Sequence, residues 1–258
     1  MLPYISSTSY HFLGLSFQTW GTFVALGFLI GTYVAWRRAK NLGLKADAIP
    51  DIAFWILISA FICARLFHAF FYDPLFYLAH PFSILDPRRS GYAMFGGLIG
   101  AVLAGWTYLR KKRLTFLAYA DALIFGLPWG IGIGRLGCFL IHDHPGIATT
   151  FFLGVRYPDG LIRHDLGLYD SLIGFATGLL FLILNRWKRA PGFWLGSFCM
   201  IEGLSRFLLD FLRIADVQYF GLTPTQYLAA PLFFVGAWLV GRAGRPPLCL
   251  PLAKGESR

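Results

Sequence analysis

Charged side chains are scarce in this chain. Asp, Glu, Lys and Arg make up 14% of its 258 residues, whereas 57% of the residues are hydrophobic. A soluble domain usually carries about 25% charged residues, so this composition excludes an ordinary soluble protein and predicts an integral membrane protein. Aromatic residues reach 18%, which is typical of helices that face lipid and of the belts at the membrane interface.

Cysteine and acidic residues are also few. The four cysteines do not form any Cys-x-x-Cys pair, so we expect small buried side chains rather than a disulfide framework or a zinc site. With 13 acidic against 23 basic residues the net charge is +10, which in a soluble protein would suggest a nucleic-acid partner. Here most of the basic residues lie in the loops between apolar segments, so we expect no nucleic-acid partner. The N-terminus lacks a basic region, so we expect no cleavable signal peptide.

Seven apolar segments are long enough to cross a bilayer, which takes about 20 residues per helix. The predicted fold is an all-α integral membrane protein: a seven-transmembrane helical bundle that forms a single domain over 1–258, with a C-terminal tail at 242–258. The fourth segment contains GLPWGIGIGRLG, and we expect it to be bent or partly unwound. The segments are 17–36, 51–72, 91–109, 116–141, 168–184, 193–212 and 224–241.

The basic residues predict the orientation. Fifteen lie in one set of loops and tails and five in the opposite set, while Arg65, Arg135 and Arg206 lie inside the apolar segments. The positive-inside rule therefore places the N-terminus outside and the C-terminus in the cytoplasm. The segment 142–167 then forms a small extracytoplasmic arm or head, in which FFLGVRYPDG favours a hairpin or an extended arm. The five outside residues are Arg88, Arg89, Arg156, Arg163 and Arg213.

Two arginines inside the apolar segments point to a site. A guanidinium in hydrocarbon costs about 2.5–3.5 kcal/mol, so it must face the bundle interior or water. Arg135 stands among glycines, which we expect to leave room beside it, and has no acidic residue four positions away. Arg206 belongs to a helical series with Glu202, Asp210 and Arg213, which forms either an ion-paired seam or part of a site. A permanent cation suits a phosphate or another lipid headgroup.

The segment His142-Asp143-His144 follows the fourth apolar segment directly. Three interpretations remain open at this point. The histidines could bind a metal with His164 and Asp165, they could perform acid–base chemistry with Asp143 orienting an imidazole, or the loop could simply return to water. A membrane metalloenzyme and a small-solute transporter or channel therefore stay as alternatives, although no internal repeat favours a transporter.

Several segments resemble, in order along the chain, the motifs of the prolipoprotein diacylglyceryl transferase family. GRLGCFLIHDHPG (134–146) is similar to the family signature, with Arg135, Gly137, Phe139 and Gly146 in place and Asp143 where the family has Glu. YAMFGGLIGA resembles the Gly-Gly-Leu motif, SRFLLDFLR the Arg-x3-acid-x2-Arg helix, and RHDLGLYDS the His…Leu-Tyr-Glu segment. Three further stretches, WGTFVALGFLIGTYVAWRRA, ICARLFHAFFY and FGLTPTQYLAAPLFFVGAW, resemble the first, second and closing spans.

The resemblance implies an activity: transfer of the sn-1,2-diacylglyceryl group of phosphatidylglycerol to the lipobox cysteine thiol of bacterial prolipoproteins, with release of sn-glycerol 1-phosphate. The implied partners are phosphatidylglycerol, prolipoprotein signal peptides with a lipobox cysteine, and membrane lipid. The implied location is the bacterial plasma (inner) membrane, as a multi-pass protein. No metal or organic cofactor is expected. The alternative is a catalytically inactive paralogue that binds anionic phospholipid or lipoprotein precursors.

The resemblance also implies site residues, with three departures from the family pattern. Trp20 stands where the family has Tyr, Phe95 where it has His, and Cys138 where it has Asn. Because Phe95 removes the family's usual candidate base, we expect His142 or His144, oriented by Asp143, to remove the thiol proton. The expected catalytic residues are Arg206, His142, Asp143 and His144, and the expected substrate-binding residues are Arg135, Gly96, Gly97, Gly137, Gly146 and Arg213.

Overall fold

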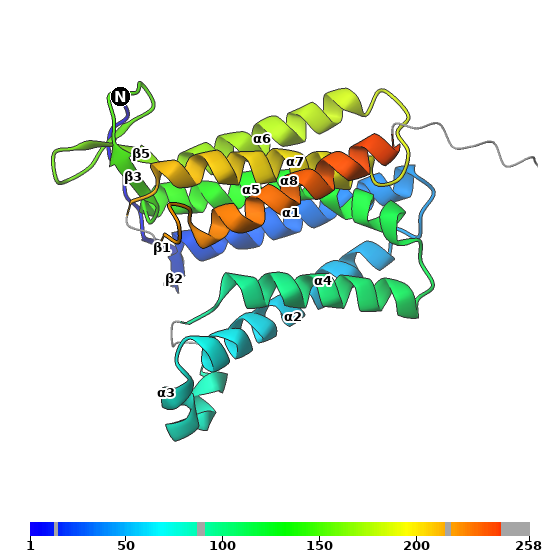
Figure 1. The fold of residues 1–258 in the computed structure, drawn as a ribbon, viewed down its shortest axis with the longest axis horizontal. Helices are drawn as coiled ribbons and strands as arrows, with labels where there is room; N and C mark the ends of the chain where they lie inside the picture. Colours follow the sequence, from blue (N-terminus) through cyan, green and yellow to red (C-terminus); the bar gives the residue numbers. More distant parts are fainter. Residues whose placement is uncertain (13–14, 87–90, 215–217, 244–258) are drawn as a thin grey trace, which may run out of the picture. The chain divides into compact units, whose positions relative to one another are not determined.

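The computed structural model describes residues 1–12, 15–86, 91–214 and 218–243 (Figure 1). Most of the tail at 242–258 and the loop arginines Arg88 and Arg89 therefore lie outside the described residues. The helices are α1 (Thr19–Asn41), α2 (Ala48–Phe71), α3 (Pro74–Ala79), α4 (Met94–Lys111), α5 (Phe116–Ile141), α6 (Leu166–Leu184), α7 (Phe193–Leu209) and α8 (Pro224–Ala243), with 3-10 turns η1 (Pro81–Leu85) and η2 (Asp210–Leu212).

The helices are those of a membrane protein. Each of the seven predicted apolar segments contains a helix, and α3 is an additional short one. Among the described residues, α1, α2, α5 and α6 are long and apolar enough to cross a membrane. Their length follows from apolar runs of about 20 residues or more, which bury backbone hydrogen bonds inside the helix and expose apolar side chains to lipid.

The expected unwinding of the fourth segment is wrong. Helix α5 is continuous from Phe116 to Ile141, although Pro128 lies inside it and removes one backbone donor. Its glycines serve helix packing instead of breaking the helix. A Cβ added to Gly130 would lie 2.9 Å from the carbonyl oxygen of Gly27 in α1, so the two backbones approach too closely for any side chain.

The chain folds into two compact units. The smaller unit comprises residues 32–123 and has a core in which the end of α1 packs with α2, α4 and the start of α5, around Ala39, Ile49, Ile52 and Tyr119. Its buried Arg65 donates hydrogen bonds to the backbone carbonyls of Ser83, Ile84, Asp86 and Gly91 at 2.9–3.1 Å. These four acceptors explain why this cation is tolerated at 5% exposure.

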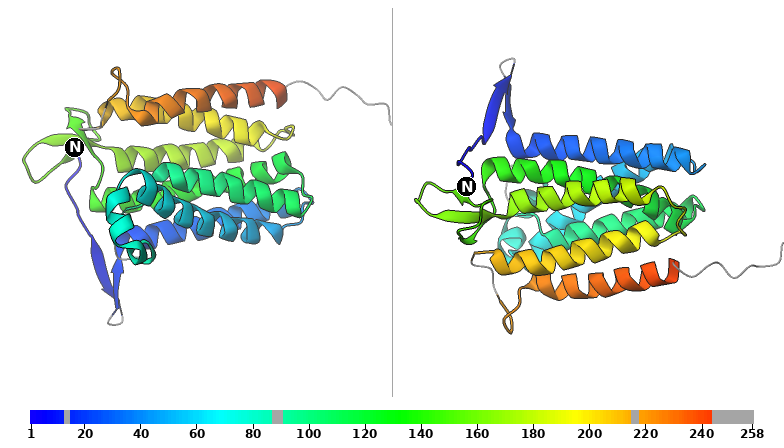
Figure 2. Two further views of the ribbon diagram at one scale, coloured as in Figure 1. Left: turned by 60° about the horizontal axis from the view of Figure 1, so that its bottom comes forward. Right: turned by 90° about the horizontal axis from the view of Figure 1, so that it is seen from above.

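The larger unit comprises residues 1–31 and 124–258. In it α7 and α8 run side by side, as both views in Figure 2 show, and the small residues Gly203 and Gly236 bring their backbones together. Gln226 joins the two helices: its side-chain oxygen accepts from the backbone N–H of Thr223 at 2.9 Å, and its Nε2 donates to the carbonyl of Phe207 at 3.0 Å.

The head of the larger unit is a small antiparallel sheet in the order β3 (Pro145–Ala148), β5 (Ile162–Asp165), β4 (Val155–Arg156). The hairpin predicted from FFLGVRYPDG is confirmed, since β4 and β5 pair across the turn at 157–161. The N-terminal segment adds to this head: Leu2 forms a parallel bridge with Val155, and the N–H of Ser7 donates to the carbonyl of Leu140 at 3.0 Å. Strands β1 (Ser9–Phe12) and β2 (Leu15–Gln18) form a separate hairpin before α1.

Candidate active site

A carboxylate in α6 links the two arginines that the sequence singled out. Oδ2 of Asp170 lies 3.3 Å from Nε of Arg135 in α5 and 2.9 Å from Nη1 of Arg206 in α7. Arg206 also donates through Nε to Oε1 of Glu202 at 2.8 Å. Asp170 is buried, whereas the arginine side chains retain 25% and 22% exposure, so the network is open to a ligand on the guanidinium side.

The close approach of α5 and α6 places Arg135 opposite Asp170. The hydroxyl of Ser171 donates to the carbonyl of Gly132 at 2.8 Å, and a Cβ on Gly174 would lie 2.7 Å from the backbone nitrogen of Gly132. Arg135 follows Gly132 by three positions, and Asp170 precedes Ser171. A glycine contact and a hydroxyl hydrogen bond therefore fix the register that brings acid and guanidinium together.

The glycines around Arg135 do not open the space that the sequence suggested. A Cβ on Gly132 would lie 3.0 Å from the ring of Phe175, and one on Gly137 would lie 2.8 Å from Cβ of Phe23. Both glycines therefore allow close helix packing, and the predicted role of Gly137 in substrate binding stays a proposal. Gly134 is less crowded, with Val24 at 3.9 Å. The side chain of Arg135 nevertheless remains 25% exposed.

His142 is oriented by a carboxylate other than the predicted one. Its Nδ1 lies 2.6 Å from Oδ2 of Asp165, the residue whose other oxygen accepts from the N–H of Leu168 at the start of α6. The ring of Tyr4 stacks on the imidazole with centroids 4.2 Å apart, and the side chain is 1% exposed. His142 has a φ of 52°, a left-handed conformation that follows the last residue of α5.

Asp165 is the centre of this buried cluster. It also accepts from the hydroxyl of Tyr157 at 2.9 Å, and burial together with the charge of Asp165 raises the pKa of Tyr157 well above its usual value. His142 and Asp165 thus bind each other inside the head. His164 instead pairs with the hydroxyl of Tyr169 at 2.7 Å, so the alternative metal set of His142, His144, His164 and Asp165 is not brought together in the described part of the chain.

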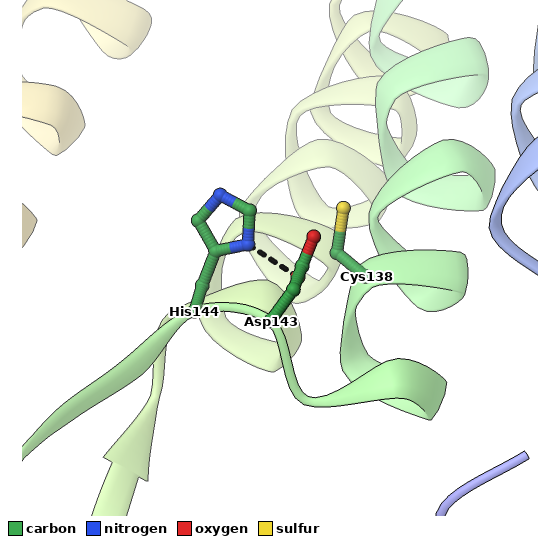
Figure 3. A group of neighbouring side chains, drawn as sticks. All are labelled: Cys138, Asp143 and His144. Atoms are coloured by element: carbon green, nitrogen blue, oxygen red, sulfur yellow. Dashed lines mark hydrogen bonds and ion pairs between the residues drawn. The ribbon is translucent and has the colours of Figure 1, made fainter. Parts of the chain in front are cut away.

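His144 and Asp143 form the pair that the sequence predicted. Nδ1 of His144 makes a short hydrogen bond with Oδ1 of Asp143, and both side chains are about one-third exposed. Figure 3 shows the Asp143 carboxylate between the imidazole and the thiol of Cys138. Cys138 lies in the last turn of α5, and its Sγ is 4.0 Å from Nη1 of Arg135. The pair is therefore connected through Cys138 to the arginine network.

Arg213 and Gly146 meet at the boundary between the head and the end of α7. Their backbones form an antiparallel bridge, and a Cβ on Gly146 would lie 2.7 Å from the carbonyl of Leu212. Nε of Arg213 pairs with Oδ1 of Asp210 at 3.1 Å. The seam predicted in this helix thus exists as two pairs, Glu202 with Arg206 and Asp210 with Arg213. A role of Gly146 and Arg213 in substrate binding stays a proposal.

Gly96, Gly97 and Phe95 lie at the start of α4 in the smaller unit, where Phe95 is half-buried. A Cβ on Gly96 would lie 2.4 Å from the carbonyl of Cys63, so this glycine allows α4 to pack against α2. Gly97 is less confined, with the nearest atoms of Ala60 and Ala64 at 3.6 Å. Their predicted contact with lipid remains a proposal.

The sequence did not single out Asp170 as a site residue, and it offered Asp165 only as a candidate metal ligand and Glu202 only as a member of the charged helical series. Asp170 carried a signal, because it stands at the acidic position of the RHDLGLYDS segment. Asp165 carried one as a helix N-cap before an apolar run, which is a common place for Asp. Neither pattern identifies which basic group will pair with the carboxylate.

Comparison with known proteins decides the family. The sequence profile described as prolipoprotein diacylglyceryl transferase matches residues 8–242, nearly the whole chain. The chain belongs to the prolipoprotein diacylglyceryl transferase family. This confirms the resemblance that the motifs carried, and it makes the chain a member of a family of transferases.

Curated relatives of this diacylglyceryl transferase family cover most of the chain. The phosphatidylglycerol–prolipoprotein diacylglyceryl transferase of Roseobacter denitrificans is 32% identical over 262 residues, covering 85% of this chain and 89% of the relative. The proteins of the same name from Geobacter sulfurreducens and Clostridioides difficile are each 31% identical, covering 91% and 84% of this chain. In this family member, the Arg135–Asp170–Arg206 network is therefore the candidate active site.

Proposed function

We propose that this chain transfers the diacylglyceryl group of phosphatidylglycerol to the lipobox cysteine thiol of a prolipoprotein and releases sn-glycerol 1-phosphate. The observation that supports this proposal best is the pair of partly exposed guanidiniums, Arg135 and Arg206, held by one buried carboxylate. The family membership and the names of the relatives supply the substrate class.

The charge change in the reaction explains the need for two cations. The thiolate attacks the diacylglyceryl carbon, the carbon–oxygen bond to phosphate breaks, and its electron pair stays on the phosphate. The phosphodiester carries one negative charge, and the departing monoester gains a second. Arg135 binds the headgroup, and Arg206 stabilises the additional charge as it develops. Among the described residues, the contacts of Arg206 use Nε and Nη1, so Nη2 is available to a phosphate oxygen.

The thiol must lose its proton before it attacks, because the thiolate is the nucleophile. His144, paired with Asp143 and about one-third exposed, is the better placed of the two predicted bases. His142 is buried beneath Tyr4 and bound to Asp165. In this proposal His144 accepts the thiol proton, while His142 holds the head in place.

The membrane arrangement belongs to the same proposal. Seven helices span the bacterial plasma membrane, with the N-terminus outside and the C-terminus in the cytoplasm. The distribution of basic residues supports this orientation, because fifteen lie on the proposed cytoplasmic side and five on the other. The head at 142–167 then meets the signal peptide at the outer leaflet. Cysteine accessibility from each side of intact cells tests this arrangement.

The decisive experiment measures the mass of a lipobox peptide after incubation with the purified protein and phosphatidylglycerol. The expected result is a mass increase of one diacylglyceryl group with equimolar release of glycerol phosphate. Arg135→Gln and Arg206→Gln should lose this activity, whereas the exposed head variant Asp159→Asn should keep it. A protein that binds phosphatidylglycerol vesicles but leaves the peptide mass unchanged would instead be the inactive paralogue.

Three variants assign the base. His144→Ala should slow transfer strongly, and His142→Ala should lower the thermal stability of the head more than the rate. Near-normal turnover of the double variant His142→Ala/His144→Ala would refute a role for either imidazole in proton removal.

A further inference from the structure

Three side chains near the arginine network form a group of which the proposed transfer reaction uses His144 and Asp143 but leaves Cys138 without a role. Sγ of Cys138, a carboxylate oxygen of Asp143 and a ring nitrogen of His144 all lie within 4.8 Å of one another (Figure 3). Cys138 comes from the last turn of α5, and the other two come from the turn between α5 and β3. Thiolate, carboxylate and imidazole are the ligand types that zinc prefers in proteins.

We infer that Cys138, Asp143 and His144 bind a zinc ion, with water in the fourth position. The three ligands lie at positions i, i+5 and i+6, so one short segment of the chain, 138–144, supplies all of them. Cys138 is buried, whereas His144 and Asp143 retain 29% and 35% side-chain exposure. The ion can therefore enter from the head, and one coordination position faces solvent.

The local charges suit a divalent cation. A thiolate and a carboxylate carry two negative charges, which neutralise zinc when the imidazole binds as a neutral ligand. The neighbouring arginines are already balanced, since Arg135 pairs with Asp170 and Arg206 with both Asp170 and Glu202. Nη1 of Arg135 lies 4.0 Å from Sγ of Cys138 and donates a hydrogen bond to the sulfur.

Binding requires a small, balanced rearrangement. The Cys138 thiol releases its proton to solvent, and the imidazole and carboxylate exchange their mutual hydrogen bond for bonds to the ion. Zinc–ligand bonds of about 2.0–2.3 Å require the three donor atoms to move closer to a common centre. Both Asp143 and His144 lie in a partly exposed turn, so this movement does not disturb the packed part of α5.

The scattered positions of the four cysteines in the sequence did not predict a zinc site. The signal is Cys138 itself, which stands where the family signature has Asn. An amide in that place cannot supply the thiolate, so the inferred site depends on this departure. This also supplies the natural test variant, Cys138→Asn, which restores the family residue with a side chain of similar size.

The test uses Co²⁺ as a spectroscopic probe in the purified protein. The expected result is one equivalent of bound Co²⁺ with a thiolate-to-cobalt charge-transfer band that Zn²⁺ abolishes by displacement. Cys138→Asn should lose the band and weaken binding at least about 100-fold, since even the loss of an outer-shell partner weakens metal sites by 10–100-fold. The control Cys199→Ser, in a buried thiol of α7, should leave the band unchanged. Absence of the band in the unchanged protein, or its retention in Cys138→Asn, would overturn the inference.

A second readout concerns activity and rests on the proposed function. Zinc that occupies Asp143 and His144 removes the proton acceptor, so it should inhibit lipobox-peptide transfer by the unchanged protein and leave Cys138→Asn uninhibited. If the metal-free protein shows no transfer at all, the proposed function fails while the cobalt titration still decides the metal site. Transfer that persists with the cobalt band fully developed would refute the role of His144 as the base.

Discussion

Asp170→Asn is the substitution that tests the candidate site most directly. Oδ2 of this buried carboxylate forms an ion pair with Nε of Arg135 at 3.3 Å and accepts a hydrogen bond from Arg206 at 2.9 Å. A hydrogen bond to a charged group contributes about 1.5–3 kcal/mol and the ion pair with the partly exposed Arg135 about 1 kcal/mol, so the two contacts together amount to about 2.5–4 kcal/mol. The amide oxygen of asparagine can still accept one neutral bond of about 0.5–1.5 kcal/mol. The net loss is therefore about 2–3 kcal/mol.

If this loss falls on the transition state, transfer slows about 30- to 160-fold, since each 1.36 kcal/mol corresponds to a factor of ten. The assay is the initial rate of diacylglyceryl addition to a lipobox peptide in mixed micelles, followed by peptide mass, with thermal unfolding measured on the same samples. The matched control is Asp159→Asn, which removes an exposed carboxylate paired with Arg163 and should change the rate less than about twofold.

A double-mutant cycle separates orientation of the arginine from general damage. Asp170→Asn and Arg135→Gln should be strongly non-additive, with a coupling of at least about 1 kcal/mol, because the two groups contact each other. An Asp170→Asn protein that transfers at the normal rate and unfolds at the normal temperature would refute the claim that this carboxylate positions the guanidiniums. Full additivity of the two substitutions would refute it as well.

Three further predictions concern stability and are measured by unfolding in detergent. Gly203→Ala forces a methyl group against the backbone of α8, 2.7 Å from a carbonyl, and should destabilise by about 1–3 kcal/mol, whereas Gly241→Ala, with open space around it, should not destabilise. Burial lowers the pKa of His164 below its ordinary 6.5, so the unfolded chain binds a proton at this residue more readily than the folded chain. The free energy of unfolding should therefore be highest above pH 6.5 and should decline as the pH falls below 6.5. The decline should be smaller in His164→Gln, which lacks the imidazole. Tyr4→Ala removes the ring stacked on His142 and should cost about 0.5–1.5 kcal/mol; an unchanged unfolding temperature would contradict this.

The sequence predicted the helices well because their main determinant is local. An apolar run of about 20 residues must hydrogen-bond its own backbone in lipid, whatever else the chain does. The hairpin at FFLGVRYPDG was likewise predicted from neighbouring residues, and the pairing of β4 with β5 across the turn at 157–161 confirms it. The error in α5 came from weighing Pro128 and the glycines as helix breakers. In the folded protein, Gly130 and Gly132 are contact points with other helices, and that use depends on partners far away in the sequence.

The candidate site was only partly predictable for the same reason. Arg135 and Arg206 were identified because a guanidinium in an apolar segment has no local explanation. Their common partner, Asp170, lies in another helix, and periodicity within one segment does not reveal such a pairing. The two histidines illustrate the limit most clearly, because residues 142 and 144 look equivalent in the sequence. His142 directly follows the end of α5 and has a left-handed backbone conformation, which turns its side chain toward Asp165. His144 instead pairs with Asp143.

The pairing of residues 2–7 with the head has a consequence for biosynthesis. Leu2 exchanges backbone hydrogen bonds with Gly154 and Arg156, and Ser7 bonds to Leu140, all of which lie in the second half of the chain. During translation, residues 2–7 therefore stay unpaired until Leu140, Gly154 and Arg156 have been synthesised. Closure of so long a loop is slow and comes late. In a nascent chain arrested before residue 154, residues 2–7 should therefore be sensitive to protease. The stacking of Tyr4 on His142 is then among the last contacts to form.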